Sequence, residues 1–167
     1  MRLKRESRPL AVPTRVAGAV ESLAVDIGSR VREGDGLVAL ESLDAHAQVE
    51  ESRASVEIAR ARVRGAQAVM EKSDLAIRLA EADLKRAQQS RDRVADSVTD
   101  AEVERREVLV AQAVIERTIS ETTLRSSEVE VALAMSKLNS AEMVLSRHQI
   151  MAPFEGVVTR CLLYTSD

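Results

Sequence analysis

The chain has 167 residues, a formal net charge of −3, one phenylalanine, one tyrosine and no tryptophan. A compact globular domain would use more large aromatic side chains in its core, so this composition indicates an extended molecule. The balanced charge excludes the basic face that nucleic-acid binding requires. No apolar run follows the basic residues near the N-terminus, so the sequence shows neither a signal peptide nor a membrane span.

The N-terminal region predicts an irregular leader followed by short strands. Residues 1–13 contain two prolines and form the leader. Residues 14–25 are rich in valine and alternate in part, as a half-buried strand does. Two glycine-containing turns follow, at residues 26–29 and 31–36, and residues 37–41 form a short apolar strand.

The segment from Ser42 to His148 contains no proline and a single glycine, Gly65. Its apolar residues repeat every seven positions, each followed three residues later by a small residue, and this pattern predicts a coiled coil. The first series is Val49, Val56, Val63, Met70, Ile77 and Leu84, with the followers Ser52, Ala59, Ala66, Ser73, Ala80 and Ala87. The second is Val103, Val110, Arg117, Leu124, Val131, Leu138 and Leu145, with the followers Arg106, Ala113, Ser120, Ser127, Ala134 and Ala141.

The two series are out of phase, so the helix must break between them. Their offset matches neither of the usual coiled-coil insertions of three or four residues. Thr99 and Glu102 form a capping box, in which the Thr99 hydroxyl accepts from the Glu102 amide and the Glu102 carboxylate reaches back. We therefore expect two helices, at about 44–95 and 99–149, that fold back as an antiparallel hairpin with its tip near residues 91–99.

The hairpin has consequences for packing. Because the arms are nearly equal in length, we expect the residues before Ser42 to lie beside those after His148. The small followers should let the helices approach closely, with large residues of one arm over small residues of the other. We expect Arg117, which interrupts the second series, to extend outwards along its aliphatic stem. Ion pairs are expected along single helices at Asp74–Arg78, Glu102–Arg106 and Glu121–Arg125.

Two motifs flank the hairpin. Before it come Gly18-x-Val20 and a three-residue spacing of Val25, Gly28, Val31, Gly34, Leu37 and Leu40; after it comes Ala152-Pro153-Phe154-Glu155-Gly156-Val157-Val158. They resemble the first half of a biotinyl/lipoyl-type domain and the opening of its second half. A lipoyl-like domain split by a long helical hairpin resembles the HlyD-type membrane fusion proteins, the periplasmic adaptors of tripartite efflux and secretion systems.

This resemblance implies an α+β fold dominated by α structure. A long antiparallel coiled-coil hairpin, residues 42–149, would be inserted in a partial lipoyl-like β domain formed by residues 14–41 and 150–160. In the family the second half continues past Val158 and a β-barrel follows; residues 161–167 do not fit this pattern, and we expect them to be a non-native tail. The implied location is periplasmic, associated with the inner membrane in the full-length protein.

The resemblance also raises the alternative of a true carrier domain. Carrier domains modify a lysine between their two halves, and Asp44 stands in that place here. Because an aspartate cannot form the amide to biotin or lipoate, we expect no prosthetic group. Ser42 or Asp44 is expected to cap the first helix instead.

The resemblance places partner binding at the hairpin tip. In the family an Arg near the end of the first helix, a Leu in the turn and a Ser opening the second helix contact an outer-membrane channel. Here Arg91 or Arg93, Val94 and Thr99 match these positions, with Val for Leu, Thr for Ser and a shorter spacing, and Ser97 lies in the same turn. The implied partners are this channel, an inner-membrane transporter and further copies of the chain in a ring.

Other residues predict no chemistry. His46 and His148 would lie near each other at the base of the hairpin, but two histidines without a carboxylate or cysteine make a poor metal site. No nucleophile, base and orienting group are assembled, so we expect neither an enzyme nor a cofactor. The alternative function is a plain structural scaffold, in which the helical segment dimerises with another chain and has no transport role.

Overall fold

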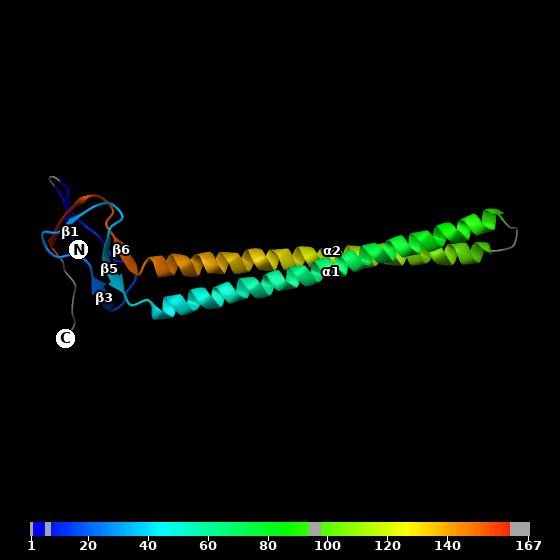
Figure 1. Cartoon of the computed structure of the whole chain (residues 1–167), viewed down its shortest axis with the longest axis horizontal. Coiled ribbons are helices and arrows are strands. Elements are labelled where there is room, and N and C mark those ends of the chain that lie inside the picture. Colours follow the sequence, from blue (N-terminus) through cyan, green and yellow to red (C-terminus); the bar gives the residue numbers. More distant parts are fainter. Residues whose placement is uncertain (1, 6–7, 94–97, 161–167) are drawn as a thin grey trace. The chain divides into compact units, whose positions relative to one another are not determined.

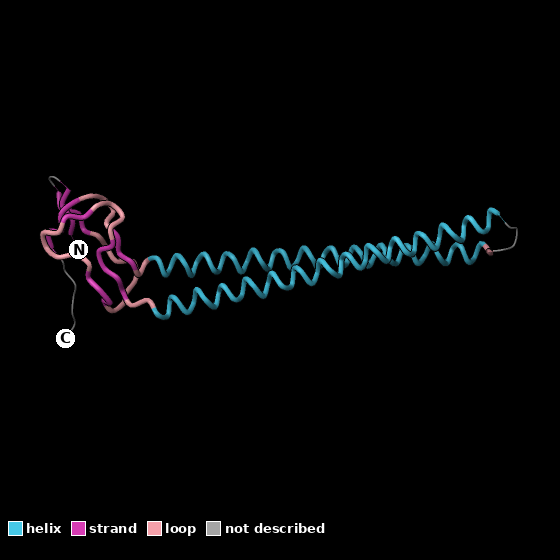
Figure 2. Tube along the Cα trace, viewed as in Figure 1, coloured by secondary structure: helices cyan, strands magenta, loops and turns pink. Residues whose placement is uncertain are grey.

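The computed structural model describes residues 2–5, 8–93 and 98–160, and the chain divides into two compact units (Figure 1). Met1–Arg53 and Lys137–Asp167 form one, which we call the β unit, and Ala54–Ser136 form the other, the hairpin unit. The strands all belong to the β unit, whereas the hairpin unit consists of helix on either side of its tip (Figure 2). The expected α+β fold with a helical hairpin is confirmed.

The β unit contains two small antiparallel sheets. One has the order β2-β1-β7-β4 and the other the order β3-β5-β6. Their bounds are Arg2–Arg5 for β1, Arg8–Ala11 for β2, Val20–Leu23 for β3, Arg30–Val31 for β4, Gly36–Leu40 for β5, Gln149–Met151 for β6 and Gly156–Arg160 for β7. Both sheets therefore combine strands from before and after the helices.

An apolar core holds the β unit together. Leu3, Leu37 and Val158 are its fully buried side chains among the described residues. Burying a side chain of this size contributes ~1.5–3 kcal/mol relative to leaving it exposed. The other buried members are Val31, Val38, Leu40, Ile150 and Ala152. Residues from both ends of the chain thus share one core.

Residues 2–5 and 8–11 form strands, where the sequence predicts an irregular leader. β1 pairs with β2 and with β7, and Leu3 of β1 lies in the core. The prolines concealed this arrangement, because a proline within a short run normally argues against a strand. Pro9 lies in β2, which is an edge strand of its sheet, where proline is tolerated.

Two turns fix how the halves of the β unit meet. Gly28 and Gly34 have φ values of 94° and 85°, a left-handed conformation that glycine adopts without penalty. The Gly28 amide donates to the Val158 carbonyl and the Gly34 amide to the Ala152 carbonyl, each at 2.8 Å. The two glycine turns that the sequence predicts therefore donate hydrogen bonds to the segment that follows the hairpin.

Two long helices connect the halves. α1 spans Leu43–Arg93 and α2 spans Asp100–Ser146, with 51 and 47 residues. The carbonyl of Ser42 accepts the first helical hydrogen bond of α1, from the His46 amide at 2.8 Å, so Ser42 rather than Asp44 is the capping residue. Asp44 lies in the first turn, where its charge favours the helix N-terminus.

The seam of the hairpin follows the predicted repeat. Every residue of both apolar series, and every follower, is buried or half-buried. One heptad beyond Leu84, the last residue of the first series, lies Arg91, which is exposed. Gly65 is exposed, as its outward heptad position predicts. The sequence period therefore identifies the packed face of each helix.

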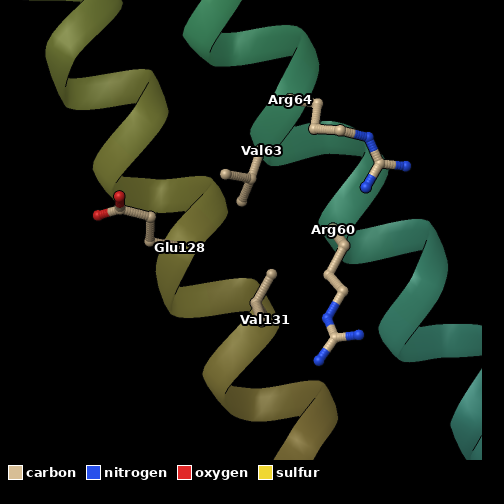
Figure 3. A pocket seen from close by; sticks show the side chains of 5 residues that line it. All are labelled: Arg60, Val63, Arg64, Glu128 and Val131. Atoms are coloured by element: carbon tan, nitrogen blue, oxygen red, sulfur yellow. The ribbon is translucent and has the colours of Figure 1, made fainter.

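The layers of the seam differ from the expectation that large residues cover small ones. The hydroxyl oxygens of Ser73 and Ser120 lie 3.0 Å apart, so a small residue faces a small one. Figure 3 shows Val63 and Val131 directed towards each other between the helices, so a large residue faces a large one. The reason is the register of the two antiparallel helices. Each step of seven residues forward along α1 corresponds to a step of seven residues backward along α2. A layer of small residues in one helix therefore always faces a layer of small residues in the other.

Candidate functional site

The described part of the hairpin tip is built by the end of α1 and the start of α2. Thr99 precedes α2, and its hydroxyl oxygen accepts from the Glu102 amide at 3.2 Å. Its carbonyl also accepts from the amides of Glu102 and Val103. Asp100 and Glu102 place negative charge in the first turn of α2. The Thr99 half of the predicted capping box is therefore present.

The Glu102 half is arranged differently. Its carboxylate lies 2.9 Å from Arg106 and 3.3 Å from Arg105, instead of reaching back to the start of the helix. Arg106 Nη1 is buried, and its approach to Glu102 does not have hydrogen-bond geometry. Arg106 occupies a seam position where the other followers are small, so the carboxylate is drawn to its charge.

The first helix ends in two arginines. Arg91 and Arg93 lie in the last turn of α1, where a positive charge favours the C-terminal end of the helix dipole. Arg91 Nη1 lies 3.5 Å from Asp100 Oδ1 of α2, and Arg91 Nε lies 3.6 Å from Asp92 Oδ1. These groups are exposed, so the ion pairs contribute little to stability.

The structure places some of the predicted tip residues and not others. Arg91, Arg93 and Thr99 lie at the same end of the hairpin unit, with Arg91 joined to α2 by its contact with Asp100. Val94 and Ser97 lie outside the described residues. The seam is closed as far as Ala87 and Val103, which are 6% and 5% exposed, and the Arg91 side chain is 42% exposed.

One interaction near the middle of the hairpin was not predicted. Arg117 Nε donates to Asp74 Oδ1 at 3.2 Å across the seam, and Arg117 Nη1 donates to Glu121 at 2.6 Å. Arg117 therefore bridges the two helices instead of extending outwards, and Asp74 pairs with it rather than with Arg78. The sequence could have predicted this contact, because Arg117 and Asp74 lie at nearly equal distances from the tip of the hairpin.

Two further ion pairs cross the seam in the same way. Arg62 Nη1 lies 2.7 Å from Glu130 Oε2, and Arg53 Nη2 lies 3.7 Å from Glu142 Oε1. The side chains are about half exposed, so each pair contributes ~1 kcal/mol at most. These pairs favour one register of α1 against α2, because sliding one helix along the other would separate the paired charges.

Near Val63 and Val131 the surface of the hairpin unit is hollowed. This pocket, of about 310 Å³, is also lined by Arg60, Arg64 and Glu128 (Figure 3). It lies beside the seam, and its walls are the two valines and the stems of the charged residues. In Figure 3 the Arg60 side chain extends alongside the space between the helices, whereas those of Arg64 and Glu128 extend away from it, so the pocket is a gap between seam layers.

The base of the hairpin closes through backbone contacts. The Leu40 amide donates to the His148 carbonyl at 2.8 Å, and Ala39 of β5 pairs with Gln149 of β6. His148 Nδ1 lies 3.0 Å from the Val144 carbonyl oxygen. Within the described residues, no group of three or more histidine, cysteine or acidic side chains is placed to hold a metal ion.

The described helices also bear on membrane insertion. Neither α1 nor α2 has a stretch that is long and apolar enough to cross a bilayer. Both carry charged residues throughout their length.

Comparison with known proteins gives structural similarity only. No family model matches the sequence, and no curated protein matches it. The membrane fusion protein Spr0693 from Streptococcus pneumoniae R6 is 19% identical, with a TM-score of 0.46 over 89% of this chain and 48% of its own. The soluble domain of LipC, a membrane fusion protein of a type I secretion system, is 16% identical, with a TM-score of 0.44 over 88% and 91%. The periplasmic adaptor EmrA is 16% identical, with a TM-score of 0.39 over 92% and 66%.

The chain thus spans about half the length of Spr0693. These proteins belong to the class that the flanking motifs resemble.

Proposed function

We propose that the chain is part of a non-enzymatic periplasmic adaptor of the HlyD type, which bridges an inner-membrane transporter and an outer-membrane channel in efflux or type I secretion. The observation that carries this proposal is the position of the hairpin inside a split β unit. Strands from before and after it pair directly, β5 with β6 and β4 with β7. Together with the lipoyl-like motifs at Gly18–Leu40 and Ala152–Val158, this supports an arm inserted in a lipoyl-like base.

The helices suit a mechanical role. At 1.5 Å per residue, the 51 residues of α1 correspond to ~77 Å of helix. The seam and the ion pairs that cross it resist sliding of α1 along α2. An adaptor needs such stiffness to hold its two binding regions at a fixed separation, and it needs no catalytic group.

In this proposal the tip binds the channel protein. Arg91, Arg93, Val94, Ser97 and Thr99 form the contact, and the arginines donate hydrogen bonds to the carbonyl groups at helix ends of the partner. Arg91 is held by Asp100 only at 3.5 Å, and both groups are exposed. Exchanging this weak pair for a partner's acceptor therefore has little free-energy cost.

The scaffold alternative is disfavoured by the use of the seam. The seam face of each helix is buried against the other helix of the same chain, as the contact between Ser73 and Ser120 shows. A scaffold that dimerises through the same seam would have to open this hairpin first.

Crosslinking tests the adaptor proposal directly. Cysteines introduced at Val94 and at Thr99, with Cys161 replaced by Ser, should crosslink to an outer-membrane channel protein in cells that contain both. A cysteine at exposed Ala76, far from the tip in α1, is the matched control and should give no such product. Equal yield from the tip and from Ala76, or no product from either tip position, would count against the adaptor function.

A further inference from the structure

The middle of α2 has a composition that favours a helix only weakly. Residues 114–123 contain six β-branched side chains, at Val114, Ile115, Thr118, Ile119, Thr122 and Thr123. Such side chains lose rotamer freedom against the preceding turn of a helix, so they favour the helix less than alanine or leucine does. In α1, Gly65 lies close to Val63, which faces Val131 of α2, and glycine is also unfavourable inside a helix. Both helices therefore have a low intrinsic helix propensity in this part.

Hydroxyl side chains in the same part of α2 compete for its backbone carbonyl groups. Five of them donate to the carbonyl four residues earlier, each at 3.0 Å: Thr118 to Val114, Ser120 to Glu116, Thr122 to Thr118, Thr123 to Ile119 and Ser127 to Thr123. These carbonyls are also the acceptors of the helical hydrogen bonds. A hydroxyl that shares such a carbonyl weakens the helix slightly and often bends it.

The seam is polar at this height. Ser73 and Ser120 are 6% and 3% exposed, and their hydroxyl oxygens lie 3.0 Å apart. The Ser73 hydroxyl also lies 3.1 Å from the Val69 carbonyl oxygen, and the Ser120 hydroxyl lies 3.0 Å from that of Glu116. Each hydroxyl has one proton, so two protons serve three contacts. Such a layer contributes less hydrophobic stabilisation than two alanines would.

A hollow lies on the base side of the serine layer. Val63 and Val131 face each other there, and the pocket beside them measures about 310 Å³ (Figure 3). Both valines are only half-buried, whereas Val56 towards the base and Val103 near the tip are 4% and 5% exposed. Because side chains that line a gap lose packing contacts, separating the helices here has a lower free-energy cost.

We propose that residues 63–77 of α1 and 114–131 of α2 form a joint, at which the two helices separate locally and the hairpin bends. Low helix propensity, competing hydroxyls, a polar seam layer and a hollow coincide in this segment, and each lowers the free energy of local opening. This inference goes beyond the proposed function, because it concerns the hairpin alone and needs no partner protein.

Ion pairs near both ends of the joint preserve the register of the helices. Arg62 lies 2.7 Å from Glu130 towards the base, and Arg117 lies 3.2 Å from Asp74 towards the tip. Both pairs form only in one register, so α1 and α2 return to the same register after each opening. The arm can therefore change direction with little change in its length.

Hydrogen exchange of the full chain tests where the hairpin opens. Amides of residues 118–127 should exchange about tenfold faster than those of residues 50–59 and 134–141, because the joint opens more easily than the flanking seam. A uniform helical hairpin opens from its ends, so its middle would exchange most slowly. Protection of residues 118–127 equal to or above that of the flanking segments would overturn the proposal.

Spin-label distances across the seam test the opening directly. In a Cys161→Ser background, Ala68→Cys with Arg125→Cys reports on the joint, and Ala54→Cys with Asn139→Cys is the matched control towards the base. All four labels lie at exposed positions, and the two pairs are displaced by two heptads along both helices, so their geometry is the same. The joint pair should give a distance distribution about twofold wider than the control pair. Equal widths would contradict a joint.

A stiffened variant tests the cause of the opening. Thr118→Ala, Thr122→Ala and Thr123→Ala together remove three competing hydroxyls at exposed positions and leave the seam intact. This triple variant should slow exchange in the joint about tenfold and narrow the distance distribution across it. The control is the triple variant Val108→Ala, Gln112→Ala and Val144→Ala, at exposed positions elsewhere in α2. It should leave both readings unchanged; equal slowing by both triple variants, or none by the first, would refute the proposed joint.

Discussion

At the scale of single residues, backbone conformation and charge decide the important contacts. Gly28 and Gly34 turn the chain so that their amides reach the strand region after the hairpin. Their necessity was predictable from the sequence, because tight turns between short strands require glycine. Residue spacing along one helix does not predict the pairing of Arg117 with Asp74, because the two residues lie on different helices, on either side of the seam.

A substitution at Gly28 should destabilise the β unit through its backbone. Gly28→Ala should lower the free energy of unfolding by ~1–2 kcal/mol, because a residue with a Cβ is disfavoured at positive φ. The surrounding space is open, so steric clash adds nothing. Gly36→Ala is the matched control, since that glycine is equally open and lacks a positive φ. Urea titrations followed by NMR signals of the β unit should separate the two variants; equal stability would refute the conformational argument.

At the scale of elements, the heptad repeat predicted the helices and their packed faces. The repeat identifies Val49, Val56 and Ala59 as seam residues, and all are buried. It did not predict which layers face each other, because register depends on where the turn lies, and the periods alone leave that open. The strands at residues 2–5 and 8–11 are harder to predict for a different reason: they are short, and β1 pairs with β7, which is distant in the sequence.

Enlarging a small seam residue should separate the helices. Ala66 is 8% exposed, and Ala66→Leu should destabilise the hairpin by ~1–3 kcal/mol through overpacking. Small residues face each other in this layer type, as Ser73 and Ser120 do, so the added carbon atoms would push the two helices apart. Ala76→Leu, at an exposed position, is the control and should be nearly neutral. Thermal unfolding followed by circular dichroism measures both, and an unchanged or raised melting temperature for Ala66→Leu would contradict tight packing.

At the scale of the whole molecule, the hairpin allows two distant parts of the sequence to form one core. Leu40 and His148 are far apart in the chain, yet their backbones are hydrogen-bonded. Bringing such distant residues together has a large entropic cost in a flexible chain, and a hairpin that closes from its tip lowers that cost. The pattern of strand, helix, helix and strand was therefore readable from the sequence, and so was the meeting of its ends. The proposed binding of a partner by the tip cannot be read from this chain alone, because it depends on the surface of a second protein.

The most direct test of the account is whether α1 and α2 pair within one chain. Spin labels at Arg53 and Glu142, whose charged groups lie 3.7 Å apart, should report a short distance. Diluting the doubly labelled protein with unlabelled chain should leave this coupling unchanged, and singly labelled chains should show none. A long distance, or a coupling that disappears on dilution, would mean that the helices pair between chains; the scaffold would then replace the adaptor.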